Sequence, residues 1–486
     1  MSDNKNFKKE FASGVGYTAI TKYAGMAISL VISAVLARIL SPEDYGVIAI
    51  AMVIIAFLSI FSDMGIGPAV IQIQDLDKSE LDTIFSFTVY LGIVLGGLFY
   101  GASYLVADWY NDERLVTVCQ LLSLNLAFAS FNIVPNGILL RNRRFRFIAI
   151  RTLSIQIVLG VMSVIAALAG IGLYALLINP VIGSIVIFVV NYHQYPRNFY
   201  FILKKSPIKR VASYSIYQFL FSIQNYFTRN LDTLLIGKYI GMSNLGFYQK
   251  SYQLIGLPVG NIGHVVSPVL HPIMAQYQDD LIFQRDKYTK VLSILAMIGM
   301  PLSVFLCFTG AELITIVYGD QWGNAIPVFQ ILSLTVGLQI MGATGGSIYQ
   351  ATNNTKFMFY MGLFCTMVNI CGILFGIFIL RTIEGVAWML VFTFTILAPV
   401  TYWLQYKYVF KSSVSLLIRP LLPAFIYSFI LFLFLGSLYY LLSDCNVFFS
   451  LFVKTAIFIV CLSYALNRHK VINLSSIYKR VISKCH

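Results

Sequence analysis

Long apolar segments alternate with short polar connections along the whole chain. An apolar helix of about 17–25 residues can cross a bilayer, and fourteen segments fit this length. The longest polar stretches, 194–212 and 273–290, are too short to hold a folded domain. The pattern therefore predicts an all-α integral membrane protein with about fourteen transmembrane helices. We expect them at roughly 14–38, 45–70, 83–107, 115–136, 148–169, 173–193, 213–237, 247–272, 291–317, 325–349, 358–380, 385–406, 418–442 and 447–467.

The composition agrees with this class of protein. Of the 486 residues, 58% are hydrophobic and 11% are charged, whereas a soluble domain carries about 25% charged residues. The net charge of +14 does not indicate nucleic-acid binding, because the basic excess of a membrane protein belongs first to its cytoplasmic loops. The seven cysteines form no CxxC pair and lie mostly in apolar segments. We therefore expect neither a disulfide nor a metal site.

The distribution of Lys and Arg predicts the orientation of the chain. With the N-terminus inside, 26 of the 34 basic residues fall on inner segments and 5 on outer ends. The positive-inside rule then places both termini in the cytoplasm. The first apolar segment lacks an A-x-A cleavage site, so we expect a retained first helix rather than a signal peptide.

Landmarks of the first half recur in the second half in the same order. Gly46 is matched by Gly246 at an offset of 200, and Q-L-L-S-L at 120–124 by Q-I-L-S-L at 330–334 at an offset of 210. The slow drift of the offset indicates an ancestral duplication of a six-helix unit. Because six is even, the two copies enter the membrane from the same side, as in transporters that place the substrate between parallel repeats.

The repeat predicts three parts of the chain. We expect an N-terminal six-helix lobe at 1–200 and a C-terminal six-helix lobe at 201–410. Two additional transmembrane helices and a cytoplasmic tail occupy 411–486.

Polar residues in the predicted helix 213–237 form one stripe. Asn225, Arg229 and Asp232 step by four and three residues, so they share a helix face. Gln218 extends this face. Because a charge at the centre of a bilayer helix costs about 2.5–3.5 kcal/mol, the stripe predicts contact with a wet cavity. The alternative is that Arg229 and Asp232 pair to hold helices together.

Four further polar residues in predicted helices are candidates for binding or coupling. Lys22 either enters the cavity or snorkels to the inner interface, and Lys250, near the outer end of its helix, has the same two interpretations. His264 either carries coupling protons or packs inside the protein. Asp63 precedes a helix break ahead of Pro68. It either caps the broken end or binds a coupling cation.

Four stretches carry a resemblance to a known family. They read R-I-L-S-P-E-D-Y-G-V-I-A-I-A, F-S-D-M-G-I-G-P-A-V-I-Q, R-N-L-D-T-L-L-I-G-K-Y-I-G and L-G-F-Y-Q-K-S-Y-Q-L-I-G-L-P. They resemble the polysaccharide exporters of the multidrug/oligosaccharidyl-lipid/polysaccharide superfamily, and in particular the Wzx-type, colanic-acid-exporter-like flippases. The resemblance covers nearly the whole chain, although this family often has twelve helices.

The resemblance implies a two-lobed transporter of the bacterial cytoplasmic membrane. Its cargo would be a lipid-diphosphate-linked oligosaccharide, moved from the inner to the outer leaflet by alternating access for surface polysaccharide biosynthesis. A cationic cavity would receive the diphosphate, with Lys22 and Arg229 as the candidate ligands. Polysaccharide polymerase and chain-length proteins are the implied partners, besides membrane lipid, and we expect a monomer.

No enzyme signature is present in the sequence. No outer loop is large enough for paired catalytic carboxylates, and no G-x-x-x-x-G-K-[ST] loop occurs. We expect no cofactor; transport would be driven by the membrane potential or by H⁺ or Na⁺ coupling through Asp63, Asp232 or His264. The alternatives are a cation-coupled drug or metabolite antiporter of the same superfamily, a polysaccharide polymerase or ligase, and a scaffold that does not transport.

Overall fold

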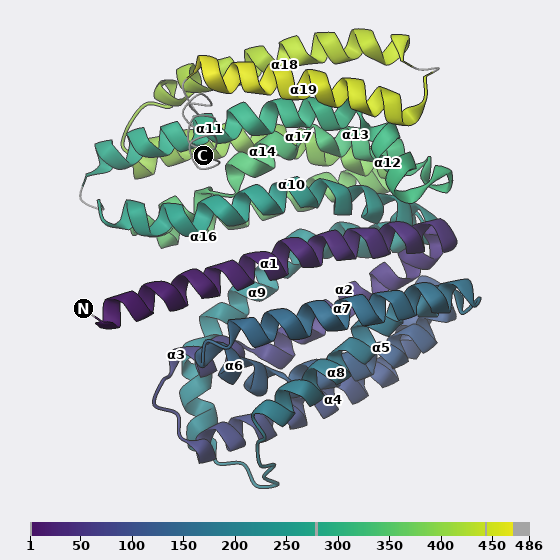
Figure 1. Cartoon of the computed structure of the whole chain (residues 1–486), viewed down its shortest axis with the longest axis vertical. Helices are drawn as coiled ribbons and strands as arrows, with labels where there is room; N and C mark the ends of the chain where they lie inside the picture. Colours follow the sequence, from purple (N-terminus) through teal and green to yellow (C-terminus); the bar gives the residue numbers. More distant parts are fainter. Residues whose placement is uncertain (1, 278–279, 443–444, 470–486) are drawn as a thin grey trace, which may run out of the picture. The chain divides into compact units, whose positions relative to one another are not determined.

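The structure, a computed structural model, describes residues 2–277, 280–442 and 445–469, and every regular element in them is a helix (Figure 1). Within these ranges, side chains are described for all residues except 2–15, 211–218, 220–221, 264–265, 267–269, 271–272, 355 and 440. The chain packs as two compact units, Met1–Gly246 and Phe247–His486. The predicted all-α membrane class is confirmed.

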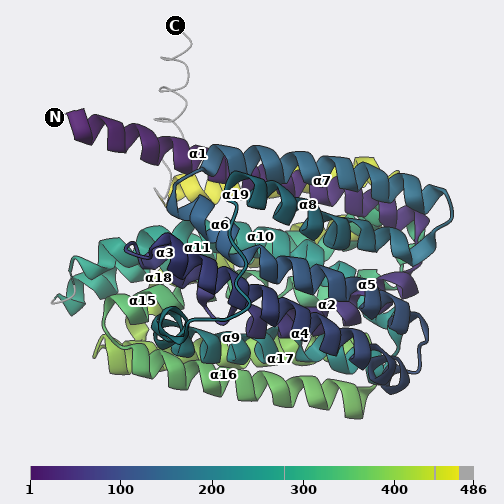
Figure 2. The same cartoon turned by 90° about the horizontal axis from the view of Figure 1, so that it is seen from below.

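The first unit contains the first nine α-helices and the start of the tenth. Within it, α4 lies along α5 (Figures 1 and 2), α1 packs against α7, and α9 packs against α2, α3 and α4. The helices are α1 Ser2–Ile39, α2 Pro42–Asp63, α3 Ile66–Gln72, α4 Lys78–Tyr110, α5 Arg114–Phe131, α6 Ile133–Arg141, α7 Phe145–Leu168, α8 Ile178–Gln194 and α9 Lys205–Tyr239, with a 3₁₀ turn at Gly172–Leu177.

The second unit contains most of α10 and all the later helices. Within it, α18 packs along α11, and α19 contacts α11, α12 and α18. The helices are α10 Met242–Ala275, α11 Leu281–Phe308, α12 Gly310–Tyr318, α13 Ala325–Ser333, α14 Val336–Gly342, α15 Gly345–Ala351, α16 Thr355–Phe375, α17 Ile383–Leu404, α18 Ser415–Leu441 and α19 Val447–Arg468, with π-turns at Gly376–Leu380 and Gln405–Val409.

Among the described residues, eleven helices are long and apolar enough to span a membrane. A twelfth span results if the bent pair Ala325–Ser333 and Val336–Ala351, which meet at 49°, is counted as one. The predicted spans 213–237 and 247–272 fall on α9 and α10, some of whose side chains lie outside the description. The count of fourteen therefore stays a prediction.

The motif S-P-E-D-Y-G builds the first turn of α2. Ser41 is the N-cap, its Oγ accepts from the Asp44 amide at 3.2 Å, and the Asp44 carboxylate accepts from the Ser41 amide at 3.0 Å. Pro42 occupies the first helical position, where its missing N–H costs nothing. The reciprocal cap fixes where α2 begins.

The start of α2 meets the start of α10 through two glycines. A Cβ on Gly46 would lie 1.9 Å from the Met242 carbonyl oxygen, and a Cβ on Gly246 would lie 1.9 Å from the Pro42 carbonyl oxygen. All four residues belong to the first unit. The two positions that match in the predicted repeat therefore make the same contact reciprocally, and neither tolerates a side chain.

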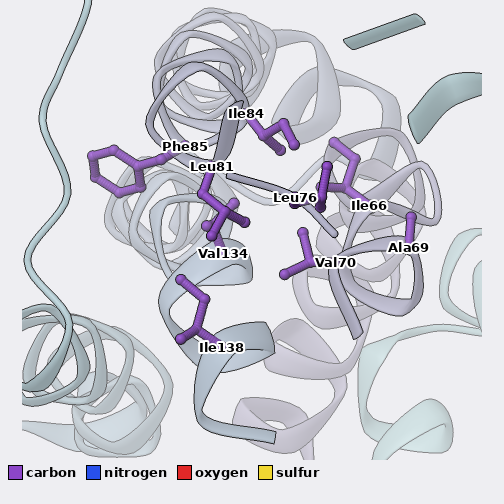
Figure 3. Packing of buried hydrophobic residues seen from close by; sticks show 9 residues of the cluster. All are labelled: Ile66, Ala69, Val70, Leu76, Leu81, Ile84, Phe85, Val134 and Ile138. Atoms are coloured by element: carbon purple, nitrogen blue, oxygen red, sulfur yellow. The ribbon is translucent and has the colours of Figure 1, made fainter. Parts of the chain in front are cut away.

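The helix break predicted after Asp63 is present, and an apolar cluster packs the helix after it, α3, against α4 and α6. Met64 and Gly65 adopt left-handed conformations, with φ of 41° and 75°, and α3 turns back into the unit. Figure 3 shows how α3, α4 and α6 are held together by buried apolar side chains: Ile66, Ala69, Val70, Leu76, Leu81, Ile84, Phe85, Val134 and Ile138.

Three of the predicted single spans are divided in the structure. The helix expected at 115–136 is α5 and α6, which separate at Asn132. The helix expected at 291–317 is α11 and α12, which separate at Thr309. The helix expected at 325–349 consists of α13, α14 and α15. None of these divisions was expected from the hydrophobic pattern, because the apolar run continues through each of them.

We predict that Gly46→Ala and Gly246→Ala each destabilise the protein. A methyl group in either place collides with a backbone carbonyl, and overpacking of this kind costs about 1–3 kcal/mol or more. Thermal unfolding of the detergent-purified protein measures the effect. Gly97→Ala is the matched control, because nothing lies within 4 Å of its Cβ position, and the change should be neutral or stabilising. Equal unfolding temperatures for all three variants would contradict the steric account.

Candidate functional site

The polar stripe lies on α9, which runs without a break from Lys205 to Tyr239. Asn225 is half-buried and Arg229 is exposed. Asp232 is 7% exposed, and one of its carboxylate oxygens accepts from the Thr233 amide at 2.7 Å. Arg229 forms no ion pair with any residue whose side chain is described. Asn225, Arg229 and Asp232 thus lie on one unbroken helix, and both the cavity and the pairing interpretations of the stripe stay predictions.

An aromatic face next to this stripe fixes α9 to α2. The Tyr226 hydroxyl donates to the Val53 carbonyl oxygen at 3.1 Å. The Phe57 ring lies 5.0 Å from the Tyr226 ring and 5.7 Å from the Phe227 ring, measured between centroids. The face of α9 that packs against α2 is thus aromatic.

Lys22 lies in α1, within the first unit. Its side chain is half-buried, and Nζ is 6.0 Å from the centroid of the Tyr23 ring. An ammonium group at this distance from a ring is only weakly held. Both interpretations of Lys22, entry into the cavity and snorkelling, therefore stay predictions.

Asp63 caps the break between α2 and α3. One carboxylate oxygen accepts from the Gly67 amide at 3.2 Å, and the other accepts from the Gly65 amide at 3.3 Å. These amides open a short helix and have no partner within it. The capping interpretation therefore describes the geometry, and cation coupling at Asp63 stays a prediction.

Lys250 is enclosed by aromatic rings in the second unit. Its side chain is 3% exposed, and Nζ lies 4.8 Å from the Tyr318 ring centroid and 5.9 Å from that of Trp322. Its Nζ also donates to the Gln253 Oε1 at 3.4 Å. This enclosure satisfies the ammonium group within the protein, so cargo binding at Lys250 would require the rings to move. The side chains of two other candidates, Gln218 and His264, lie outside the described residues.

The connection between α8 and α9 is bound along α4, which the sequence did not indicate. Asp82 is 1% exposed; its carboxylate pairs with Arg197 at 3.5 Å and accepts from Asn198 Nδ2 at 3.1 Å. One helical turn on, Ser86 Oγ accepts from the Tyr200 amide at 2.8 Å. The segment 197–200 is thereby fixed to the side of α4.

A second, exposed ion pair continues this attachment. Arg210 at the start of α9 pairs with Asp75 at 2.5 Å and with Glu80 at 3.5 Å. The hydrogen bond from Arg210 lowers the pKa of the Asp75 carboxyl. Since both groups are exposed, the pair contributes orientation more than stability.

Arg151 is a second charge in a spanning helix that the sequence analysis passed over. It lies in α7, its guanidinium donates to the side-chain Oδ1 of Asn191, and Asn191 Nδ2 donates to Asn132 Oδ1 at 2.7 Å. No described carboxylate pairs with Arg151. The network joins α7 and α8 to Asn132, at the break between α5 and α6, and thereby holds this break in place.

A buried ion pair joins α19 to α12 within the second unit. Lys454 of α19 pairs with Glu312 of α12, and both side chains are buried. The same carboxylate oxygen accepts from Ser450 Oγ at 2.6 Å, and Lys454 also donates to the Phe308 carbonyl oxygen at 2.9 Å. In the sequence, a lysine within an apolar helix indicates a buried charge that needs a partner. Its acidic partner could not be chosen from sequence.

No cluster of three or more His, Cys, Asp or Glu that could hold a metal ion occurs in the part of the chain that the structure describes. The arrangement offers isolated cations on apolar helices, of which Lys22 and Arg229 have the least enclosed head groups among the predicted sites. Such cations can bind an anionic group reversibly, and transport of an anion requires reversible binding.

The chain matches one family model over more than half its length. The model, described as "Polysaccharide biosynthesis protein", matches residues 35–327, and the chain belongs to this family. A relative, the lipopolysaccharide biosynthesis protein WzxC of Escherichia coli (strain K12), is 26% identical over 387 residues, which make up 76% of this chain and 76% of WzxC.

Two solved structures share the fold. The lipid II flippase MurJ in an inward closed conformation gives a TM-score of 0.73 at 18% identity, covering 96% of this chain and 99% of MurJ. An inward-facing multidrug resistance MATE family transporter of the MOP superfamily gives 0.60 at 16% identity, covering 80% of this chain and 96% of that transporter. These identities show the fold alone.

Together the comparisons confirm the predicted resemblance. The chain is a multi-pass membrane protein of a polysaccharide-biosynthesis family with the fold of MurJ and MATE transporters. The sequence prediction that the chain is no enzyme agrees with this family and with a fold shared by transporters.

We predict that breaking the pair of Lys454 and Glu312 costs more than removing it. Lys454→Met alone leaves a buried, unpaired carboxylate, which in a protein interior costs about 3–5 kcal/mol. Glu312→Leu with Lys454→Met should recover most of this loss, because buried pairs replaced by apolar groups are often neutral. Thermal unfolding in detergent compares the four members of the cycle. A double variant no more stable than Lys454→Met would refute the pairing.

Proposed function

We propose that this protein is a flippase for a lipid-diphosphate-linked oligosaccharide. It carries this cargo from the inner to the outer leaflet of the bacterial cytoplasmic membrane, for the biosynthesis of a surface polysaccharide such as O-antigen, capsule or exopolysaccharide. Both termini face the cytoplasm, and undecaprenyl diphosphate is the lipid carrier that the resemblance implies. The protein acts as a monomer beside a polysaccharide polymerase and chain-length proteins.

Family membership over residues 35–327 is the observation that carries this proposal. The fold adds to it, because MurJ, whose printed title calls it a lipid II flippase, covers 96% of this chain. The excess of 26 basic residues inside over 5 outside supports the orientation.

The glycine contact at the starts of α2 and α10 supports alternating access. In the proposed orientation, both helices begin at the outer surface. Gly46 and Gly246 meet the opposing backbone without side chains, so little side-chain packing is lost when the two helix starts separate. A contact of this kind closes tightly and can open at low cost.

The diphosphate group is the part of the cargo that needs a protein ligand in the membrane. Arg229 and Lys22 are the proposed anion ligands, with Asn225, Gln218 and Lys250 as further polar contacts. A membrane potential negative inside favours outward movement of an anion by about 2.3 kcal/mol per charge per 100 mV. The potential is therefore the proposed driving force, and H⁺ or Na⁺ exchange through Asp63, Asp232 or His264 is the rival.

The MATE fold favours one alternative, a cation-coupled antiporter of drugs or metabolites. That transporter matches 80% of this chain, compared with 96% for MurJ. An antiporter would expel small organic cations in an energy-dependent manner and would leave lipid-linked sugars where they are made.

Deletion of the gene, with complementation, tests the proposed function. Loss of the protein should strand lipid-linked oligosaccharide on the inner leaflet and abolish the surface polysaccharide. The leaflet is read by accessibility of the sugar to a membrane-impermeant lectin or glycosidase added to spheroplasts. Normal outer-leaflet delivery in a deletion strain without a redundant exporter would refute the flippase.

Single substitutions test the proposed anion ligands. Arg229→Ala and Lys22→Ala should each reduce surface polysaccharide by about tenfold or more in the complementation assay, because a charge-assisted hydrogen bond is worth about 1.5–3 kcal/mol. Lys356→Ala, an exposed lysine at the start of α16, is the control. All three variants are first matched for membrane abundance by immunoblot. Unimpaired export in both test variants would favour snorkelling at Lys22 and a structural role for Arg229.

A further inference from the structure

A cavity of about 330 Å³ lies in the second unit between α11, α18 and the end of α19. This volume is at the lower end of the range of small-ligand pockets, about 300–1,000 Å³. Its lining comes from three elements that are distant in sequence: Lys290, Ser293, Ile294 and Met297 of α11, Pro420 and Pro423 of α18, and His469.

The charged groups of the cavity lining are basic. Lys290 is exposed and makes no ion pair or hydrogen bond with any residue whose side chain is described. His469 is held by an edge contact with Tyr427, whose ring centroid lies 5.7 Å away. Among the described residues, no acidic side chain belongs to the lining, so the positive charge of Lys290 is not neutralised within the lining that the structure describes.

The rest of the described lining is largely apolar. Met297 is buried, and Ile294 and Pro423 are half-buried. Ser293 Oγ donates to the Pro420 carbonyl oxygen at 2.9 Å and joins the walls from α11 and α18. Basic groups beside an apolar wall suit a ligand with an anionic head and an apolar body.

The cavity lies at one end of the spanning helices. Lys290 is the tenth residue of α11, Pro420 is the sixth residue of α18, and His469 directly follows α19. In the predicted topology, these ends of the three helices face the cytoplasmic leaflet. Basic pockets between helices on the cytoplasmic side are suited to lipid head groups.

We propose that this cavity binds the phosphate head group of an anionic phospholipid of the surrounding leaflet. The ammonium group of Lys290 and the imidazole of His469 contact the phosphate, and the glycerol backbone lies against Ile294, Met297 and Pro423. The bound lipid bridges α11 to α18 and thereby stabilises the attachment of the last two helices. This site is separate from the proposed cargo ligands and does not depend on the cargo.

The test compares lipid binding by the full-length protein and by cavity variants. Short-chain dioctanoyl phosphatidylglycerol is titrated onto detergent-purified protein, and bound lipid is counted by native mass spectrometry. A lysine near an anionic lipid is worth about 1 kcal/mol, so Lys290→Ala should weaken binding about fivefold, and Lys290→Ala with His469→Ala should weaken it further through the lost imidazole hydrogen bond. Dioctanoyl phosphatidylcholine should bind weakly to every variant.

Two further variants separate charge, shape and folding. Lys287→Ala is the matched control, because Lys287 lies on the same helix outside the lining, with Nζ 5.1 Å from the Phe283 ring centroid; it should bind phosphatidylglycerol like the parent. Ile294→Trp fills the cavity without removing a charge and should also abolish tight binding. Each variant must show a parent-like unfolding temperature in phosphatidylcholine nanodiscs.

The outcomes decide between the lipid and other ligands. In the parent, phosphatidylglycerol in nanodiscs should raise the unfolding temperature, and this rise should be lost in the double variant. Equal phosphatidylglycerol affinity in the parent, the double variant and Ile294→Trp would overturn the proposal. Competition by inorganic phosphate as effective as competition by the lipid would also overturn it, because the apolar wall would then contribute nothing. Loss of polysaccharide export with unchanged lipid binding would concern only the proposed function.

Discussion

The contact between the starts of α2 and α10 is the constraint on which the arrangement of the first unit depends. Two backbones approach so closely at Gly46 and Gly246 that a methyl group at either position would overlap a carbonyl oxygen. Such an approach requires both helices to begin at fixed residues, and the reciprocal cap of Ser41 and Asp44 supplies this for α2. The motif S-P-E-D-Y-G is thus explained by geometry. It starts a helix and places a glycine one turn later against its counterpart.

A second theme is the treatment of charge inside apolar helices. Each charge is satisfied by a different means: Asp63 by backbone amides, Lys454 by Glu312, Lys250 by aromatic rings and Arg151 by an amide side chain. Arg229 differs, because it is exposed and forms no ion pair with a described residue. Among these charges, Arg229 is thus the one whose side chain has no described partner, which separates it from the structural charges.

Much of the fold could be predicted from sequence, because hydrophobic length and helix breakers act locally. The break after Asp63 followed from Gly65 and Pro68. The division at Asn132 could not be predicted, since it is stabilised by Asn191, which lies 59 residues away. For the candidate site, helical spacing placed the polar residues of α9 on one face. The partners of Lys454 and Lys250 come from other helices, and periodicity along one helix contains no information about them.

The binding of segment 197–200 to Asp82 and Ser86 has a consequence for how the chain can be divided. The predicted duplication ends near residue 200, but α9, which follows it, packs with the first unit, and the compact units divide after Gly246. The compact units thus divide one helix later than the predicted repeat. A version of the protein expressed as two polypeptides cut at residue 200 would separate α9 from α2, α3 and α4. Two polypeptides cut after Gly246 would keep these packing partners together.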